Sequence, residues 1–193
     1  MSTSSSSLRA HINTYVPLSD SDWQQIEPHF HRRTFNSGDY ILEEGKICRH
    51  LYFLQKGLLH YFVMKDGVPR TKFFTIAPYL FTSQRSFNEQ IPATESIQAI
   101  ELSVAWSISY DDNQKLLELP AWNLLSRKVT QEVQFYTEQI LEDLQNETAE
   151  TRYRKLLDAQ PELLQRIPLK YLASYLGIAP QSLSRIRQRV RNS

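Results

Sequence analysis

A long apolar stripe in the second half of the sequence constrains the fold more than any other feature. After Pro120, apolar side chains recur at spacings of three and four residues over about six helical turns. The side chains of this stripe are Trp122, Leu125, Val129, Val133, Tyr136, Ile140 and Leu144. At 1.5 Å per residue the pattern predicts one helix roughly 35 Å long. Because one small domain cannot cover such a helix, we expect part of the stripe to pack against a second copy of the chain. An ordinary intramolecular core helix is the alternative.

Before this helix, the segment 34–108 has the pattern of a β domain. Short runs rich in β-branched and aromatic residues alternate with turns that contain glycine. The runs are residues 40–42, 51–54, 58–63, 71–76, 96–100 and 104–108, and the turn glycines are Gly38, Gly45, Gly57 and Gly67. Turns spaced about 8–12 residues apart are typical of an all-β sandwich or jelly roll. Asp66-Gly67 predicts a tight hairpin turn, and Ser19 with the acids after it predicts a short helix that ends near Pro28.

These patterns predict an α+β protein. The expected parts are a flexible tail and lead-in (1–17), a β-roll or jelly-roll domain (18–118), a dimerisation helix (119–147) and a helical helix-turn-helix domain (148–193). No apolar run reaches the roughly 20 residues of a membrane span, and the serine-rich start lacks the basic and apolar blocks of a signal peptide. The single cysteine excludes a disulfide scaffold and a four-cysteine metal site within one chain. We therefore expect a cytoplasmic protein without a membrane partner.

The charge of the chain is distributed unevenly, although the net charge is only +1. Residues 147–193 carry nine Arg and Lys against four Asp and Glu, whereas the rest of the chain carries 13 against 17. A basic end on an otherwise acidic protein suggests local contact with a polyanion.

The segment 169–191 has the pattern of a helix-turn-helix. A first helix presents Leu169, Leu172, Ala173 and Leu176 to the interior, Gly177 gives the turn its backbone freedom, and Pro180 suits the first position of a second helix. Leu183, Ile186 and Val190 of that second helix point inward, so its polar face points outward. Arg, Gln and Ser are the side chains that read base edges in a major groove. The candidate DNA-binding residues are Lys170, Gln181, Ser182, Ser184, Arg185, Arg187 and Arg189. A solvated amphipathic helix that closes a small bundle is the alternative.

Taken together, the chain resembles the Crp/Fnr-type transcription factors over nearly all residues after the serine tail. Residues 38–45 and 51–57 match the family's opening strands and glycine turns, residues 152–157 resemble its helix after the dimer stalk, and residues 172–187 resemble its DNA-reading unit. The resemblance implies a cyclic-nucleotide-binding-like β-roll, a homodimer and sequence-specific binding to a pseudo-palindromic operator. It implies a regulator and not an enzyme.

Two departures from the family pattern affect the expected function. Family members that bind cyclic nucleotides carry a Gly-Glu pair and, several residues later, an Arg that holds the phosphate; here Thr82-Ser83 and Ala93-Thr94 stand near those places. A buried phosphate charge without its Arg costs several kcal/mol, so we expect no response to cyclic AMP. Thr82, Ser83 and Arg85 are candidates to bind a different small-molecule effector. We also expect the family's β-wing to be missing or vestigial, because the sequence ends just after the recognition helix.

Two histidine-containing patterns suggest other functions. His29-x-His31 resembles the metal-binding pair of cupin enzymes, but the preceding Gly, the following Glu and the third His of that pattern are missing. In Cys48-Arg49-His50 a nearby cation would favour a thiolate, although Cys48 also suits a small turn residue. We expect no catalytic residues, no metal and no cofactor. A small-molecule-binding or cupin-like catalytic β-barrel is the alternative function, and salt-dependent binding to duplex DNA separates it from a regulator.

Overall fold

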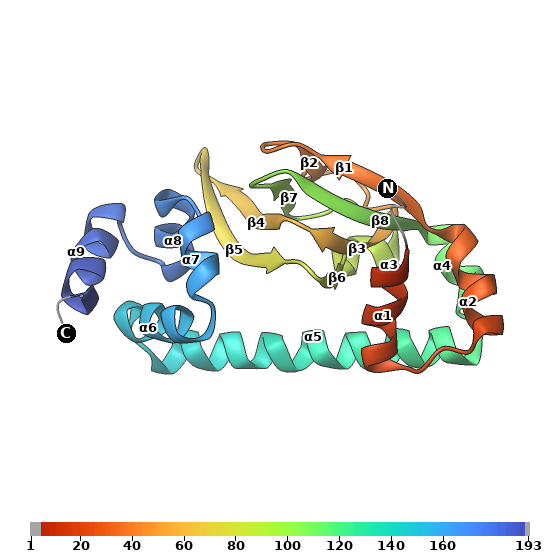
Figure 1. The fold of residues 1–193 in the computed structure, drawn as a ribbon. Coiled ribbons are helices and arrows are strands. Elements are labelled where there is room, and N and C mark those ends of the chain that lie inside the picture. The colour runs from red at the N-terminus through yellow and green to blue at the C-terminus, as the bar shows by residue number, and fades with distance from the viewer. Residues whose placement is uncertain (1–4, 192–193) are drawn as a thin grey trace.

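The computed structural model describes residues 5–191 and consists of a β-roll, a long helix and a helical head (Figure 1). The strands are β1 (His31–Phe35), β2 (Tyr40–Leu42), β3 (His50–Lys56), β4 (Leu58–Lys65), β5 (Val68–Ile76), β6 (Tyr79–Phe81), β7 (Ser96–Ala99) and β8 (Ser103–Ser109). Within the described range they form two antiparallel sheets, in the orders β1-β8-β3-β6 and β2-β7-β4-β5. The α+β fold class and its order of parts are therefore as the sequence predicts.

Helices precede, interrupt and follow the roll. They are α1 (Ser6–Tyr15), α2 (Asp20–Ile26), the 3-10 turn η1 (Glu27–His29), α3 (Gln84–Glu89), α4 (Tyr110–Leu116), α5 (Pro120–Asn146), α6 (Ala149–Ala159), α7 (Pro161–Arg166), α8 (Leu169–Leu176) and α9 (Pro180–Arg191). The long helix α5 has 27 residues, which corresponds to roughly 40 Å. No helix in residues 5–191 combines the length and the apolar character that crossing a membrane would require.

The turn and cap predictions hold. Asp66 and Gly67 both have positive φ, 53° and 72°, as the tight turn between β4 and β5 requires. Ser19 caps α2, and its backbone N–H donates to Asp22, which completes a capping box.

The N-terminal expectation was wrong from Ser6 onward. Residues 6–15 form helix α1 and not a flexible lead-in, because Leu8 and Ile12 are fully buried on one face of that helix. Both contribute to an apolar core with Val16, Trp23 and other residues of the roll and of α5. Residues 1–4 of the expected tail lie outside the described range.

The start of α5 belongs to the same core, which corrects part of the expected dimer stripe. Trp122 is 1% exposed and Leu125 is 3% exposed, and α1, α2 and the outer face of the sheet that contains β3 cover both. The Trp122 indole donates to Asn113 Oδ1 at 3.1 Å. These two side chains are therefore not available to a second subunit, and Val129 is partly buried against the same cluster.

The helical head is docked on the outer face of the other sheet. Helix α8 lies against β5, and Leu58 of β4 is buried in the apolar core of the head. The ring centroids of His60 and Tyr171 lie 4.2 Å apart, and the Thr71 N–H donates to Ser174 Oγ at 3.0 Å. The head and the roll therefore share one packed interface.

A polar clamp supports this docking at its edge. Arg166 at the end of α7 donates to both carboxylate oxygens of Glu101, at 2.6 and 3.1 Å, and to the Gly57 carbonyl at 3.2 Å. A bidentate, partly buried pair of this kind fixes orientation better than a single contact between surface charges.

Candidate nucleic-acid interface

Helices α8 and α9 form the helix-turn-helix that the sequence predicts. Gly177 has φ +72°, in the left-handed region that favours glycine, and Pro180 is the first residue of α9. The Ile178 N–H donates to the Ala173 carbonyl at 3.0 Å and so closes the end of α8. Leu172, Ala173, Leu176, Leu183 and Ile186 are buried in the head, which confirms the predicted inward faces.

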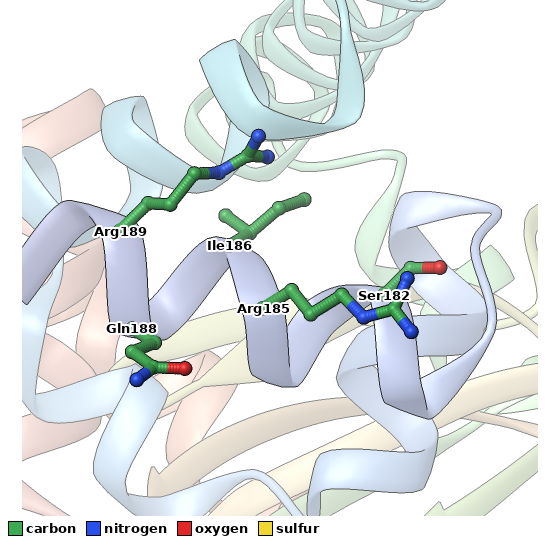
Figure 2. A pocket seen from close by; sticks show the side chains of 5 residues that line it. All are labelled: Ser182, Arg185, Ile186, Gln188 and Arg189. Atoms are coloured by element: carbon green, nitrogen blue, oxygen red, sulfur yellow. The ribbon is translucent and has the colours of Figure 1, made fainter.

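The opposite face of α9 is exposed and hollowed. Gln181, Ser182, Arg185 and Arg189 are all exposed. A shallow hollow of about 540 Å³ is lined by Ser182, Arg185, Ile186, Gln188 and Arg189 (Figure 2). Gln188 was not among the candidates, although its spacing of three from Arg185 and seven from Gln181 puts it on the same polar face.

The remaining candidates lie around this face. Arg187 and Ser184 are exposed on α9, and the Ser184 hydroxyl donates to the Pro180 carbonyl one turn earlier at 3.1 Å. Lys170 lies at the start of α8 with its ammonium 4.7 Å from the ring centre of Tyr171. It is exposed and belongs to the helix that docks on the roll.

Sequence reasoning missed an acidic residue at this site, Glu150 of α6. Its carboxylate lies 2.6 Å from Arg189 Nη2 and 3.1 Å from Arg154 Nη2. In Figure 2 the Arg189 side chain points away from Gln188 and toward a neighbouring helix. Glu150 therefore holds one of the predicted base-reading arginines in a defined direction. Only its i, i+4 spacing to Arg154 could have been read from the sequence.

Comparisons with known proteins agree with the order of a β-roll, a long helix and a helical head. Residues 32–119 match the cyclic nucleotide-binding domain family. The comparison with curated protein sequences gave no match. Among solved structures, FixK2 from Bradyrhizobium japonicum superposes with a TM-score of 0.72 at 14% identity, over 84% of this chain and 85% of that one. A protein from Eubacterium rectale, assigned to the Crp/Fnr family of transcriptional regulators, gives 0.72 at 14% over 92% and 88%.

The catabolite activator protein of Thermus thermophilus covers 91% of this chain and 84% of its own, at 20% identity and a TM-score of 0.56. These matches extend over the roll, the long helix and the head together. The chain has the Crp/Fnr-type fold.

Residues 79–95, the stretch that the resemblance compares with the family's nucleotide cassette, comprise β6, α3 and the segment before β7, and they include a carboxylate, Glu95. Ser83 is buried and donates to Glu95 Oε1 at 2.6 Å, while Lys72 Nζ lies 2.5 Å from Glu95 Oε2. Thr82 donates to the His50 carbonyl at 3.0 Å. Arg85 is mostly exposed and pairs with Glu89 on the surface of α3. The structure thus brings Ser83 close to Glu95 and leaves Arg85 outside.

The later turns of the long helix α5 carry apolar side chains that no other part of the described chain covers. Tyr136 is 47% exposed and Leu144 is 53% exposed, as are, outside the predicted stripe, Phe135 at 66% and Leu141 at 55%. Val133 and Ile140 are half-buried.

Proposed function

We propose that this protein is a transcriptional regulator that binds a pseudo-palindromic DNA site as a homodimer, with α9 as its recognition helix. The observation that carries the proposal is the exposed face of α9, where arginine, glutamine and serine side chains surround a hollow on an ordered helix-turn-helix. Arg pairs with guanine, Gln pairs with adenine, and the other basic side chains of the head suit phosphates.

The exposed part of α5 supports the homodimer. Apolar side chains from Val133 to Leu144 lie on a helix that the same chain leaves open, and a second copy related by a two-fold axis would cover them. Two recognition helices related by that axis would reach half-sites about one helical turn apart.

We further propose that cyclic AMP is not the effector. The Glu95 carboxylate lies in the cassette, hydrogen-bonded to Ser83 and paired with Lys72, and the arginine that would neutralise a phosphate is absent near Ala93-Thr94. An incoming phosphate would meet a carboxylate of like charge in a partly buried site. Calorimetry with cyclic AMP and cyclic GMP at micromolar concentrations should detect no binding, and a micromolar dissociation constant would overturn this part of the proposal.

Selection of binding sites from random duplexes with the purified protein tests the main proposal. We expect a palindromic consensus, and affinity for it that falls linearly with the logarithm of salt concentration because phosphate contacts release counterions. A protein that selects no sequence, and whose weak DNA binding shows no such slope, would be a barrel-type binding protein instead.

A further inference from the structure

A second group of basic side chains lies at the end of the molecule opposite α9. It comprises His31 and Arg33 of β1, and Arg49 and His50 at the start of β3. In Figure 1 the start of β1 and helix α4 lie at one end of the molecule and α9 at the other. DNA bound by the recognition helix would therefore not reach this group, which we name the basic mouth.

The strand register places three of these side chains on the inner face of the roll, although His31 and Arg33, on the edge strand β1, remain exposed. His31 and Tyr52 are both paired with Ser107, so the three side chains share one face of the sheet. Tyr52 is buried between the two sheets, which makes this the inner face. His50 precedes Tyr52 by two residues and Arg33 follows His31 by two, so both lie on that inner face as well.

The basic mouth has no acidic partner of its own. Within residues 5–191 none of its four side chains forms an ion pair. Asp112, nearby on α4, is engaged by His29 at 3.3 Å and by Lys115 at 2.8 Å. Burial first, and then the positive charges of Arg33, His31 and Arg49, hold the pKa of His50 below its ordinary value. The like charges thus repel one another in the absence of an anion.

A hollow of about 170 Å³ opens beside His50. It is lined by Arg49, His50, Gln90, Ser109, Tyr110 and Asp111. Sites for drug-sized ligands hold roughly 300–1,000 Å³, so this one suits a single small polar group. Gln90 and Ser109 already donate hydrogen bonds within the chain, to the Cys48 and Phe87 carbonyls and to Asp112. The guanidinium of Arg49, the imidazole of His50 and the hydroxyl of Tyr110 are left as donors toward the hollow, and Asp111 is the one carboxylate among the lining residues.

We propose that the basic mouth binds the phosphoryl group of a small molecule. Arg49 and His50 line the hollow, and Arg33 and His31 lie outside it on the same sheet face and act on His50 through their charge. A dianion with three terminal oxygens would gain from these separate cations, and arginine forks match its oxygens. The Arg33 side chain extends along this face, where its Nε lies 3.4 Å from Ser107 Oγ. The competing explanation is that inward-pointing charges only protect the edge strand β1 from pairing with other chains.

Titration with inorganic phosphate, followed through the ring signals of His50 by NMR, tests the proposal. A bound phosphate stabilises the imidazolium, so the pKa of His50 should rise with phosphate and should not rise with potassium chloride at equal ionic strength. Arg33→Gln should weaken the apparent phosphate affinity at least about tenfold, because it removes a positive charge that acts on the His50 side of the hollow. Arg32→Gln is the matched control, since it removes the same charge from the same strand but from the opposite face of the sheet.

An unchanged His50 titration in phosphate, or equal responses of the Arg32 and Arg33 variants, would overturn the proposal. Edge protection alone predicts a wild-type protein that ignores phosphate and an Arg33→Gln variant that self-associates. Light scattering on both variants detects that outcome, and neither measurement requires DNA binding.

Discussion

At the scale of single residues, the function we propose depends on which arginines of α9 meet bases and which meet phosphates. Arg185 lies in the middle of the exposed face and lines its hollow, whereas Arg187 lies beside that face. Their sequence spacing was enough to predict this difference, because buried Leu183 and Ile186 fix the rotation of the helix.

Arg185→Ala should therefore weaken binding to the selected site by about 1–3 kcal/mol and relax base preference at one position of each half-site. Arg187→Ala, the matched control, should weaken binding to specific and random duplexes alike and reduce the salt slope by about one. Fluorescence anisotropy on both duplexes measures these losses. Equal losses for Arg185→Ala on the two duplexes would assign Arg185 to a phosphate.

Glu150 shows what the sequence could not supply at this scale. Its contact with Arg189 joins two helices, α6 and α9, that are separated by most of the head, and no local pattern predicts it. The same holds for Glu95 and Ser83 in the cassette, which only the folding of the roll brings together.

Glu150→Gln tests the role of that contact. Without the carboxylate, Arg189 and Arg154 lose a competing partner, and one negative charge leaves the edge of the DNA surface. Affinity for random duplex should rise and the salt slope should steepen by about one phosphate contact, while discrimination between specific and random duplexes should fall. Salt titrations of binding measure both quantities. A variant that only loses affinity for every duplex would show that Glu150 merely stabilises the head.

At the scale of elements, the sequence predicted best where a residue with restricted backbone behaviour marks a boundary. Helix α8 ends at Leu176, just before Gly177, and α9 begins at Pro180, as these two residues predict. The roll was predicted less completely, because β1 is mostly exposed and rich in basic residues and so lacks the apolar alternation of a strand. Helix α1 was not predicted, because the segment begins with serines and has only Leu8 and Ile12, four residues apart, as buried apolar positions.

The docking of α8 on the sheet could not be predicted from the sequence. This docking predicts that the stability of the protein depends on pH. His60 is stacked against Tyr171 and bonded to Thr71, and burial, followed by the charge of Lys170, lowers its pKa to about 4. In the unfolded chain its pKa is about 6.5. As the pH falls below about 6.5, His60 therefore becomes protonated in the unfolded state but stays neutral in the folded state. The free energy of unfolding decreases progressively toward pH 4.

This loss amounts to at most about 3 kcal/mol at pH 4. Denaturant unfolding between pH 7 and pH 4 should show it, and His60→Phe, which keeps an aromatic ring in the stack, should flatten the curve. If His60→Phe and wild type lose stability in parallel, protonation of His60 does not govern the docking.

At the scale of the whole molecule, α5 decides whether one head or two can reach DNA. Its first turns are fixed in the core of their own chain by Trp122 and Leu125, and its later turns carry apolar side chains that remain open. The sequence predicted the length of the stripe correctly. It could not show where the stripe changes from the core to the surface, because that depends on the unexpected helix α1.

Val133→Glu addresses the open part of this helix. In the proposed dimer the substitution places two carboxylates near the two-fold axis, where burial and like-charge repulsion both oppose association. The variant should therefore be a monomer at neutral pH and should lose DNA affinity sharply, since a monomer reads only one half-site. Its roll should stay folded, because the cores around Phe53 and Tyr61 do not include Val133.

Gln131→Glu, an exposed position on the opposite side of α5, is the control that should remain dimeric. Light scattering at tens of micromolar protein measures the oligomeric state, and circular dichroism measures whether the roll is folded. A wild-type protein that is monomeric under these conditions would refute the dimer and the recognition by two heads that depends on it.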